Sequence, residues 1–150
     1  AIVERIRRAA TFNEGFETVE YLSSALVDMA LHVHPTGDID PRAFERETLA
    51  RLGMPREIVM RHRLPHFSHV FASDSYSAAY YSYLWADVIT ADAAEAFAEA
   101  PGGMYDADVA RRLLDGILAI GNTRDPMDAY RDFRGRDPDV GALLRKRGFD

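Results

Sequence analysis

The chain has 150 residues, of which 47% are hydrophobic and 28% charged, with a formal net charge of −6. These proportions are ordinary for a globular protein with one core and exclude an extended disordered chain. The acidic balance argues against a nucleic-acid partner, and no apolar run approaches the length of a membrane span. Cysteine is absent, which excludes disulfides and thiolate chemistry. We therefore expect a cytoplasmic protein without nucleic-acid or membrane partners.

All of the expected elements are helices. In chain order, apolar spacing and helix-end signals predict helices over residues 2–9, 13–32, 40–52, 55–62, 75–98, 106–120, 125–133 and 138–147. Two apolar stripes recur at helical spacing: Phe16, Val19, Leu22, Leu26, Met29 and Val33, and then Val109, Leu113, Ile117 and Ile120. Strict alternation of apolar and polar residues over a strand length is hard to find, so the fold class is all-α.

Aspartates and glycines mark the ends of several of these helices. An aspartate can accept a bond from a free backbone N–H, and proline suits the first helical position. This pairing occurs at Asp40–Pro41, Asp125–Pro126 and Asp137–Pro138, and Asp106 can cap a further helix. Glycines stand where helix C-caps are expected, at Gly53, Gly121 and Gly148.

Residues 63–75 interrupt this pattern. They show no helical periodicity and are long for a plain connector, and such loops in compact domains are often functional. Tyr76, Tyr80 and Tyr83 follow, and on a helix beginning near Ser75 they would share one face. A row of phenol hydroxyls can donate hydrogen bonds to an oxygen that becomes negative during reaction. Spacing alone favours the plainer alternative, in which a tyrosine-rich helix simply packs, and it places Tyr81 and Trp85 on an inward face.

Three histidines in the same stretch, His62, His66 and His69, raise the possibility of a metal site. Two histidines four residues apart can bind zinc from one helix face, but Pro65 breaks that helix. The motif H-E-x-x-H is also absent, because no histidine in the chain is followed by glutamate. A hydrogen-bonded or solvated loop cluster is the favoured interpretation; a self-sufficient metal protein would carry stoichiometric zinc.

Three stretches resemble a known family. They are FNEGFETVEYLSSALVDMALH (12–32), PHFSHVFASDSYSAAYYSYLWADVITADAAEAF (65–97) and GNTRDPMDAYRDFRGRDPDVGALLRKRGF (121–149). Together they resemble, in collinear order over nearly the whole chain, the C-terminal part of the thimet oligopeptidase and peptidyl-dipeptidase Dcp family of zinc metallopeptidases. The GN and FRGR elements are most similar to the Dcp branch.

The resemblance implies a helical piece of a zincin-like catalytic domain spanning residues 1–150. Family members are longer enzymes that cleave short peptides in a deep channel and hold zinc on an H-E-x-x-H helix and a later glutamate. Those ligands would lie before Ala1, so we expect this chain to bind no zinc, to be inactive alone, and to need the N-terminal part of the same enzyme as its partner. Exposed apolar surface would then cause self-association.

The resemblance also assigns roles to single residues. Tyr83 matches a family tyrosine that donates its O–H to the oxyanion, with His69 assisting, and Tyr76 matches one that closes over the substrate. Tyr80 could line the channel. The family loop is usually rich in glycine, whereas here it reads ASDS, with Ala79 where glycine is common.

A second hypothesis from another class is a stand-alone helical module. It would use the tyrosine row to bind a peptide without catalysis. The reading frame upstream of Ala1 separates the two hypotheses, because only a peptidase needs a zinc-binding helix there.

Overall fold

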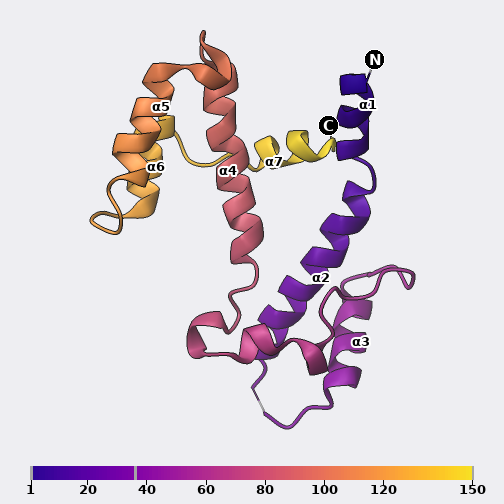
Figure 1. Cartoon of the computed structure of the whole chain (residues 1–150). Helices are drawn as coiled ribbons and strands as arrows, with labels where there is room; N and C mark the ends of the chain where they lie inside the picture. The colour runs from indigo at the N-terminus through magenta and orange to yellow at the C-terminus, as the bar shows by residue number, and fades with distance from the viewer. Residues whose placement is uncertain (1, 36, 150) are drawn as a thin grey trace. The chain divides into compact units, whose positions relative to one another are not determined.

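The computed structural model describes residues 2–35 and 37–149, and every regular element among them is helical. The expected all-α class is therefore confirmed (Figure 1). The α-helices are α1 (Ile2–Ala10), α2 (Glu14–His32), α3 (Pro41–Arg51), α4 (Ser82–Glu99), α5 (Ala107–Leu113), α6 (Pro126–Arg134) and α7 (Val140–Arg147). A π-helical turn, Leu114–Leu118, continues α5. No helix in the described part of the chain has the length and apolar character needed to cross a membrane.

The expected aspartate caps are present at three helices. The side chain of Asp40 accepts from the backbone N–H groups of Arg42 (2.8 Å) and Ala43 (3.1 Å), and Asp106 and Asp125 bind the first turns of α5 and α6 in the same way. The fourth cap was predicted two residues too early. Asp139 caps α7, whereas Asp137 instead pairs with Arg131 at 2.7 Å.

The chain divides into two compact units, residues 1–83 and 84–150. The first unit has one hydrophobic cluster of buried side chains: Val27, Met60, Leu64, Phe67 and Val70. The second unit has two such clusters, in which α4 packs on α7 through Val88 and Leu143, and on α5 and α6 through Val109 and Phe133.

The apolar stripe predicted a helix, and α2 is present, but the stripe is not the buried face of that helix. Phe16 is 45% exposed, Leu26 44% and Val33 69%. The buried side chains of α2 are mostly small or polar: Ser23, Ser24, Ala25, Val27 and Asp28. The face is polar because it binds backbone groups of the irregular segment that crosses α2 near its C-terminal end (Figure 1).

Two expected helical stretches are irregular. Residues 55–62 form turns in which the side chain of Met60 enters the core and the N–H of His62 reaches Ser24 Oγ at 3.4 Å. Helix α4 begins at Ser82 rather than Ser75, after three short 3₁₀ turns, Leu64–His66, Ser68–Phe71 and Asp74–Tyr76. Ala78 has a φ of 58°, in the left-handed region, which is incompatible with a continuous helix through that position.

Candidate active site

His69 and Tyr83 meet side chain to side chain. The hydroxyl oxygen of Tyr83, on the first turn of α4, lies 3.1 Å from Nε2 of His69, on the 3₁₀ turn Ser68–Phe71. Tyr83 is 51% exposed, so this pair is open to a ligand. Fourteen residues separate the two in sequence, and the intervening turns bring them together.

The three predicted site tyrosines gather around His69. Its ring centroid lies 4.6 Å from that of Tyr76, 6.1 Å from that of Tyr80 and 6.0 Å from that of Tyr83. The prediction that the three tyrosines share one face of a helix is wrong, however. Tyr76 ends a 3₁₀ turn and Tyr80 precedes α4, so only Tyr83 lies on a helix. The cluster is made by chain reversals around His69 and not by one helix face.

The three tyrosines differ in their exposure. Tyr76 is 43% exposed at the edge of the cluster. Tyr80 is half-buried, stacked on Tyr21 at 5.1 Å and edge-on to Phe67 at 4.8 Å. Burial raises the pKa of the Tyr80 hydroxyl, and the charge of Arg61 opposes that shift. Tyr80 thus forms the floor of the cluster, with Tyr76 and Tyr83 at its surface.

Tyr81 and Trp85 were expected on an inward face, and this expectation is wrong. Tyr81 is 53% exposed and Trp85 42% exposed. The later start of α4 explains the difference for Tyr81, because it stands in the turn before the helix and its direction is not set by helical spacing.

Two buried carboxylates that sequence analysis did not single out hold the irregular segment in place. Glu45, on α3, is 4% exposed; it pairs with Arg63 and accepts the N–H of Leu64 at 2.9 Å. Asp28, on α2, binds the same segment further along. The sequence did offer a clue to these contacts. A buried acidic residue on a helix needs hydrogen-bond donors, and a long irregular loop has backbone N–H groups that no helix or strand satisfies.

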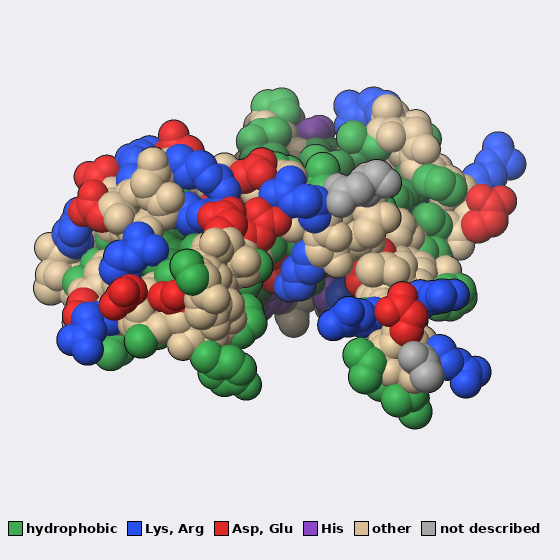
Figure 2. All heavy atoms as spheres, turned by 90° about the horizontal axis from the view of Figure 1, so that it is seen from above, with side chains coloured by type: hydrophobic (Ala, Val, Ile, Leu, Met, Phe, Trp, Pro, Cys, Tyr) green, Lys and Arg blue, Asp and Glu red, His purple; other side chains and the backbone are tan. Residues whose placement is uncertain are grey.

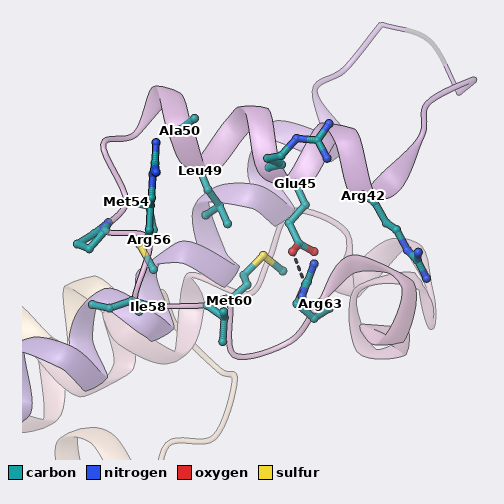
Figure 3. A pocket seen from close by; sticks show the side chains of 12 residues that line it. Arg42, Glu45, Leu49, Ala50, Met54, Arg56, Ile58, Met60 and Arg63 are labelled. Atoms are coloured by element: carbon teal, nitrogen blue, oxygen red, sulfur yellow. Dashed lines mark ion pairs between the residues drawn. The ribbon is translucent and has the colours of Figure 1, made fainter.

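Figure 3 shows the Glu45–Arg63 pair in an open pocket of about 650 Å³ between α3 and the turns that follow it. Leu49 and Met60 contribute apolar walls, while the side chain of Arg42 points away from the ion pair. None of the four predicted site residues lines this pocket. The Glu45 contacts are made with Arg63 and Leu64, at the start of the irregular segment, and with none of those four residues.

A zinc site does not fit the residues that are described here. Nowhere in residues 2–35 and 37–149 do three or more His, Cys, Asp or Glu side chains form a group that could hold a metal ion. His62 instead stacks on Phe67 with ring centroids 4.9 Å apart. The interpretation of His62, His66 and His69 as a metal cluster therefore has no support in this geometry.

Comparison with known proteins identifies the family. The model of Peptidase family M3 matches residues 1–149, and the chain belongs to this family. It is 35% identical over 151 residues to dipeptidyl carboxypeptidase of Salmonella typhimurium and 35% identical over 151 residues to oligopeptidase A of Escherichia coli. Each alignment covers 98% of this chain and 22% of the relative, so the chain spans about a fifth of the length of these curated relatives. A third relative, oligopeptidase A of Haemophilus influenzae, is 47% identical over 87 residues, which is 57% of this chain and 12% of the relative. The resemblance drawn from the sequence is confirmed.

Proposed function

We propose that this chain supplies the histidine and tyrosine wall of the active site of a zinc peptidase that cleaves short peptides. Family membership supports the reaction class, and the relatives named above carry peptidase names. The observation that carries the proposal is the 3.1 Å contact between Tyr83 Oη and His69 Nε2 on an exposed surface. A solvent-facing phenol held by a histidine is a donor aimed outward at a ligand.

In the proposed mechanism, Tyr83 donates its hydroxyl proton to the oxyanion that forms when a peptide carbonyl is attacked. His69 carries its proton on Nε2 and donates it to Tyr83 Oη, which leaves the phenol proton free for the substrate. A phenol oxygen that accepts a hydrogen bond is also a stronger donor, because bonded chains polarise one another. His69 therefore both orients and strengthens the Tyr83 donor.

Tyr76 and Tyr80 would contact the substrate on either side of this donor. Tyr76 lies beside His69 and is partly exposed, which suits a side chain that closes over a bound peptide. The ring of Tyr80 lies 5.4 Å from that of Tyr83 and would line the channel from beneath. Rigid aromatic rings offer contact area at little loss of side-chain entropy.

The zinc implied by family membership would be held by residues of the polypeptide outside this sequence. No step above depends on it, since the described residues hold the substrate and the developing negative charge only. The chain by itself is then expected to hydrolyse no peptide, and its partner is the metal-binding part of the same enzyme.

The test is Tyr83→Phe in the polypeptide that contains this chain. This substitution removes only the hydroxyl, and loss of one oxyanion donor lowers kcat about 10²–10³-fold. KM should barely change, because the contact forms in the transition state. Tyr81→Phe is the matched control, the same change at an exposed tyrosine two residues away. An unchanged kcat in Tyr83→Phe would contradict the proposal and leave the tyrosine row as a packing or peptide-binding surface.

A further inference from the structure

We infer that Asp28, braced by His32, is a positioning residue that fixes the backbone carrying Tyr80 and Tyr83 so that Tyr83 meets His69. The inference rests on the proposed function, because it assigns a role toward the same donor pair. Asp28 touches neither the pair nor any surface open to substrate, and its side chain is fully buried. Its effect must therefore pass through the backbone.

Both carboxylate oxygens of Asp28 bind one short turn. Oδ1 accepts the N–H of Ala78 at 3.2 Å, and Oδ2 accepts the N–H of Tyr80 at 3.0 Å. These groups lie 50 and 52 residues further along the chain and have no helix or strand to satisfy them. A buried backbone N–H without a partner costs about 1–3 kcal/mol, so the carboxylate specifies where this turn can lie.

His32 completes the environment of this carboxylate. His32 lies one helical turn after Asp28, and its Nδ1 is 2.8 Å from Asp28 Oδ1. We assign the proton to Nδ1, because the two oxygens beside it, Asp28 Oδ1 and the Asp28 carbonyl oxygen at 3.0 Å, can only accept. The N–H of Ala78, which lies 3.3 Å from Nδ1, then donates to Asp28 Oδ1. The imidazole also lies against Phe71 with ring centroids 5.8 Å apart, and the side chain is 20% exposed. A buried carboxylate needs several hydrogen-bond donors. His32 supplies one in addition to the two backbone N–H groups of the turn.

The same face of α2 also binds the carbonyl of the turn. Tyr21 is two helical turns before Asp28, and its hydroxyl donates to the carbonyl oxygen of Tyr80 at 2.6 Å. Ser24, between them on that face, accepts the N–H of His62. Both polar backbone groups of Tyr80 are thus held by α2, three residues before Tyr83.

This anchoring explains the direction in which Tyr83 points. The spacing of residues 75–98 favours a helix through the turn, yet Ala78 adopts a φ of 58° and α4 begins only at Ser82. The bonds from Asp28 offset the strain of an alanine in the left-handed region. Without them the turn is free to relax toward helix, which would rotate Tyr83 away from His69.

The experiment compares Asp28→Asn with Glu45→Gln by NMR of the whole chain. An asparagine can accept through only one atom, so at least one of the amides of Ala78 and Tyr80 loses its acceptor and should exchange with solvent roughly tenfold faster or more. Nuclear Overhauser contacts between the rings of His69 and Tyr83 should weaken. Glu45→Gln alters a buried carboxylate of α3 that binds the start of the same segment, and it should change exchange at Leu64 and leave Ala78, Tyr80 and the ring contacts as they were.

A second pair of variants covers the case in which Asp28→Asn fails to fold. His32→Asn keeps an N–H donor near the position of Nδ1 and should preserve the His69–Tyr83 contacts, whereas His32→Leu removes the donor and should weaken them. Unchanged Tyr80 exchange and ring contacts in both Asp28→Asn and His32→Leu would overturn the inference. Equal weakening of the His69–Tyr83 ring contacts in Asp28→Asn and Glu45→Gln would also overturn it, since this would show a general loss of stability.

Activity of the longer polypeptide separates this inference from the proposed function. Asp28→Asn should lower kcat roughly 10–100-fold with little change in KM, as misplacement of a catalytic group does. If Tyr83→Phe lowers kcat but Asp28→Asn leaves both kcat and the ring contacts unchanged, the positioning role fails and the proposed function stands. If Asp28→Asn weakens the ring contacts but Tyr83→Phe leaves kcat unchanged, Asp28 positions the pair and the pair is not catalytic.

Discussion

At the scale of single residues, the turn before α4 shows how the site is built on local strain. Ala78 is one of two non-glycine residues with positive φ in the described chain, at 58°. A Cβ in that region clashes with the neighbouring backbone and costs about 1–2 kcal/mol. The turn persists because Asp28 and Tyr21 hold its polar groups. The family resemblance indicated that this stretch is unusual, because Ala79 stands where glycine is common. The residue with positive φ is its neighbour, Ala78.

Ala78→Gly should therefore stabilise the chain. Glycine adopts positive φ without a clash, and after its larger entropy loss on folding the net gain should be about 0.5–1 kcal/mol. Ala79→Gly is the matched control; its φ is not positive, so glycine there should lower stability by about 0.5–1 kcal/mol. Urea unfolding of the three proteins measures both changes, and equal effects at the two positions would contradict the strain at Ala78.

The His69–Tyr83 pair makes a further prediction at this scale. His69→Gln retains an N–H donor near Nε2 and should keep more activity in the longer polypeptide than His69→Leu. If the two side chains act as a unit, Tyr83→Phe should lower kcat less in the His69→Leu background than in the parent. Additive effects in this double-mutant cycle, measured as kcat, would show that His69 does not act through Tyr83.

At the scale of elements, helix ends followed from the sequence where a side chain caps its own helix. Asp40, Asp106 and Asp125 behave as expected because their partners lie two or three residues away. The start of α4 could not be predicted in this way, since it is set by Asp28 and Tyr21 on a helix more than 50 residues earlier. The cluster of His69 with the tyrosines was predictable in its members but not in its geometry.

Arg134, at the end of α6, and Arg136, just after it, also depend on a partner far away in the sequence. Asp92, on α4, is fully buried and accepts bonds from Tyr130, Arg134 and Arg136. Burial alone would raise the pKa of Asp92, but the Tyr130 bond and the two guanidinium groups outweigh it and hold the pKa below its usual value of 3.8. Arg134 and Arg136 are thus ion-paired with Asp92.

The sign of this shift predicts a loss of stability in acid. A carboxyl whose folded pKa is below its unfolded pKa contributes stability that is present above the unfolded value and lost as pH falls through the folded value. The free energy of unfolding of residues 84–150 should therefore fall as pH drops below about 4. Trp85, the single tryptophan of the chain, lies in that unit and reports its unfolding by fluorescence.

Asp92→Asn tests this assignment. The variant should be about 1–3 kcal/mol less stable at neutral pH, because the charge-assisted bonds from Arg134 and Arg136 are weakened, while Arg134 keeps Glu99 as a charge partner. Its stability should also vary less with pH in the acid range. Asp115→Asn, at an exposed position on the turn after α5, should leave both properties unchanged. An equally steep acid loss in Asp92→Asn would place the titrating group elsewhere.

At the scale of the whole molecule, large apolar side chains on α1, on the turn after it and on α2 remain at the surface. They include Ile2 (73% exposed), Ile6 (63%), Phe12 (74%) and Phe16 (45%). Figure 2 shows hydrophobic side chains interspersed with charged ones on the face in view. Helical spacing placed Phe16 in an apolar stripe, but periodicity alone cannot tell a face that packs within the chain from one that is left exposed.

Such surface predicts self-association of the isolated chain. Light scattering after size exclusion should show species larger than a monomer at high concentration. Phe12→Glu should shift the distribution toward monomer, whereas Thr11→Glu adds the same charge at an exposed polar position beside it and should have little effect. A monomer at every concentration with little binding of an apolar dye would contradict this prediction.

The central claim is that Tyr83 stabilises the oxyanion, and binding of a tetrahedral analogue tests it most directly. In the longer polypeptide, Tyr83→Phe should bind a phosphinic peptide, which mimics the tetrahedral intermediate, about 10²-fold more weakly than the parent protein does. Affinity for an uncleaved peptide of the same sequence should hardly change. Equal losses for both ligands would make Tyr83 a general substrate contact, and no loss for either would remove it from the site.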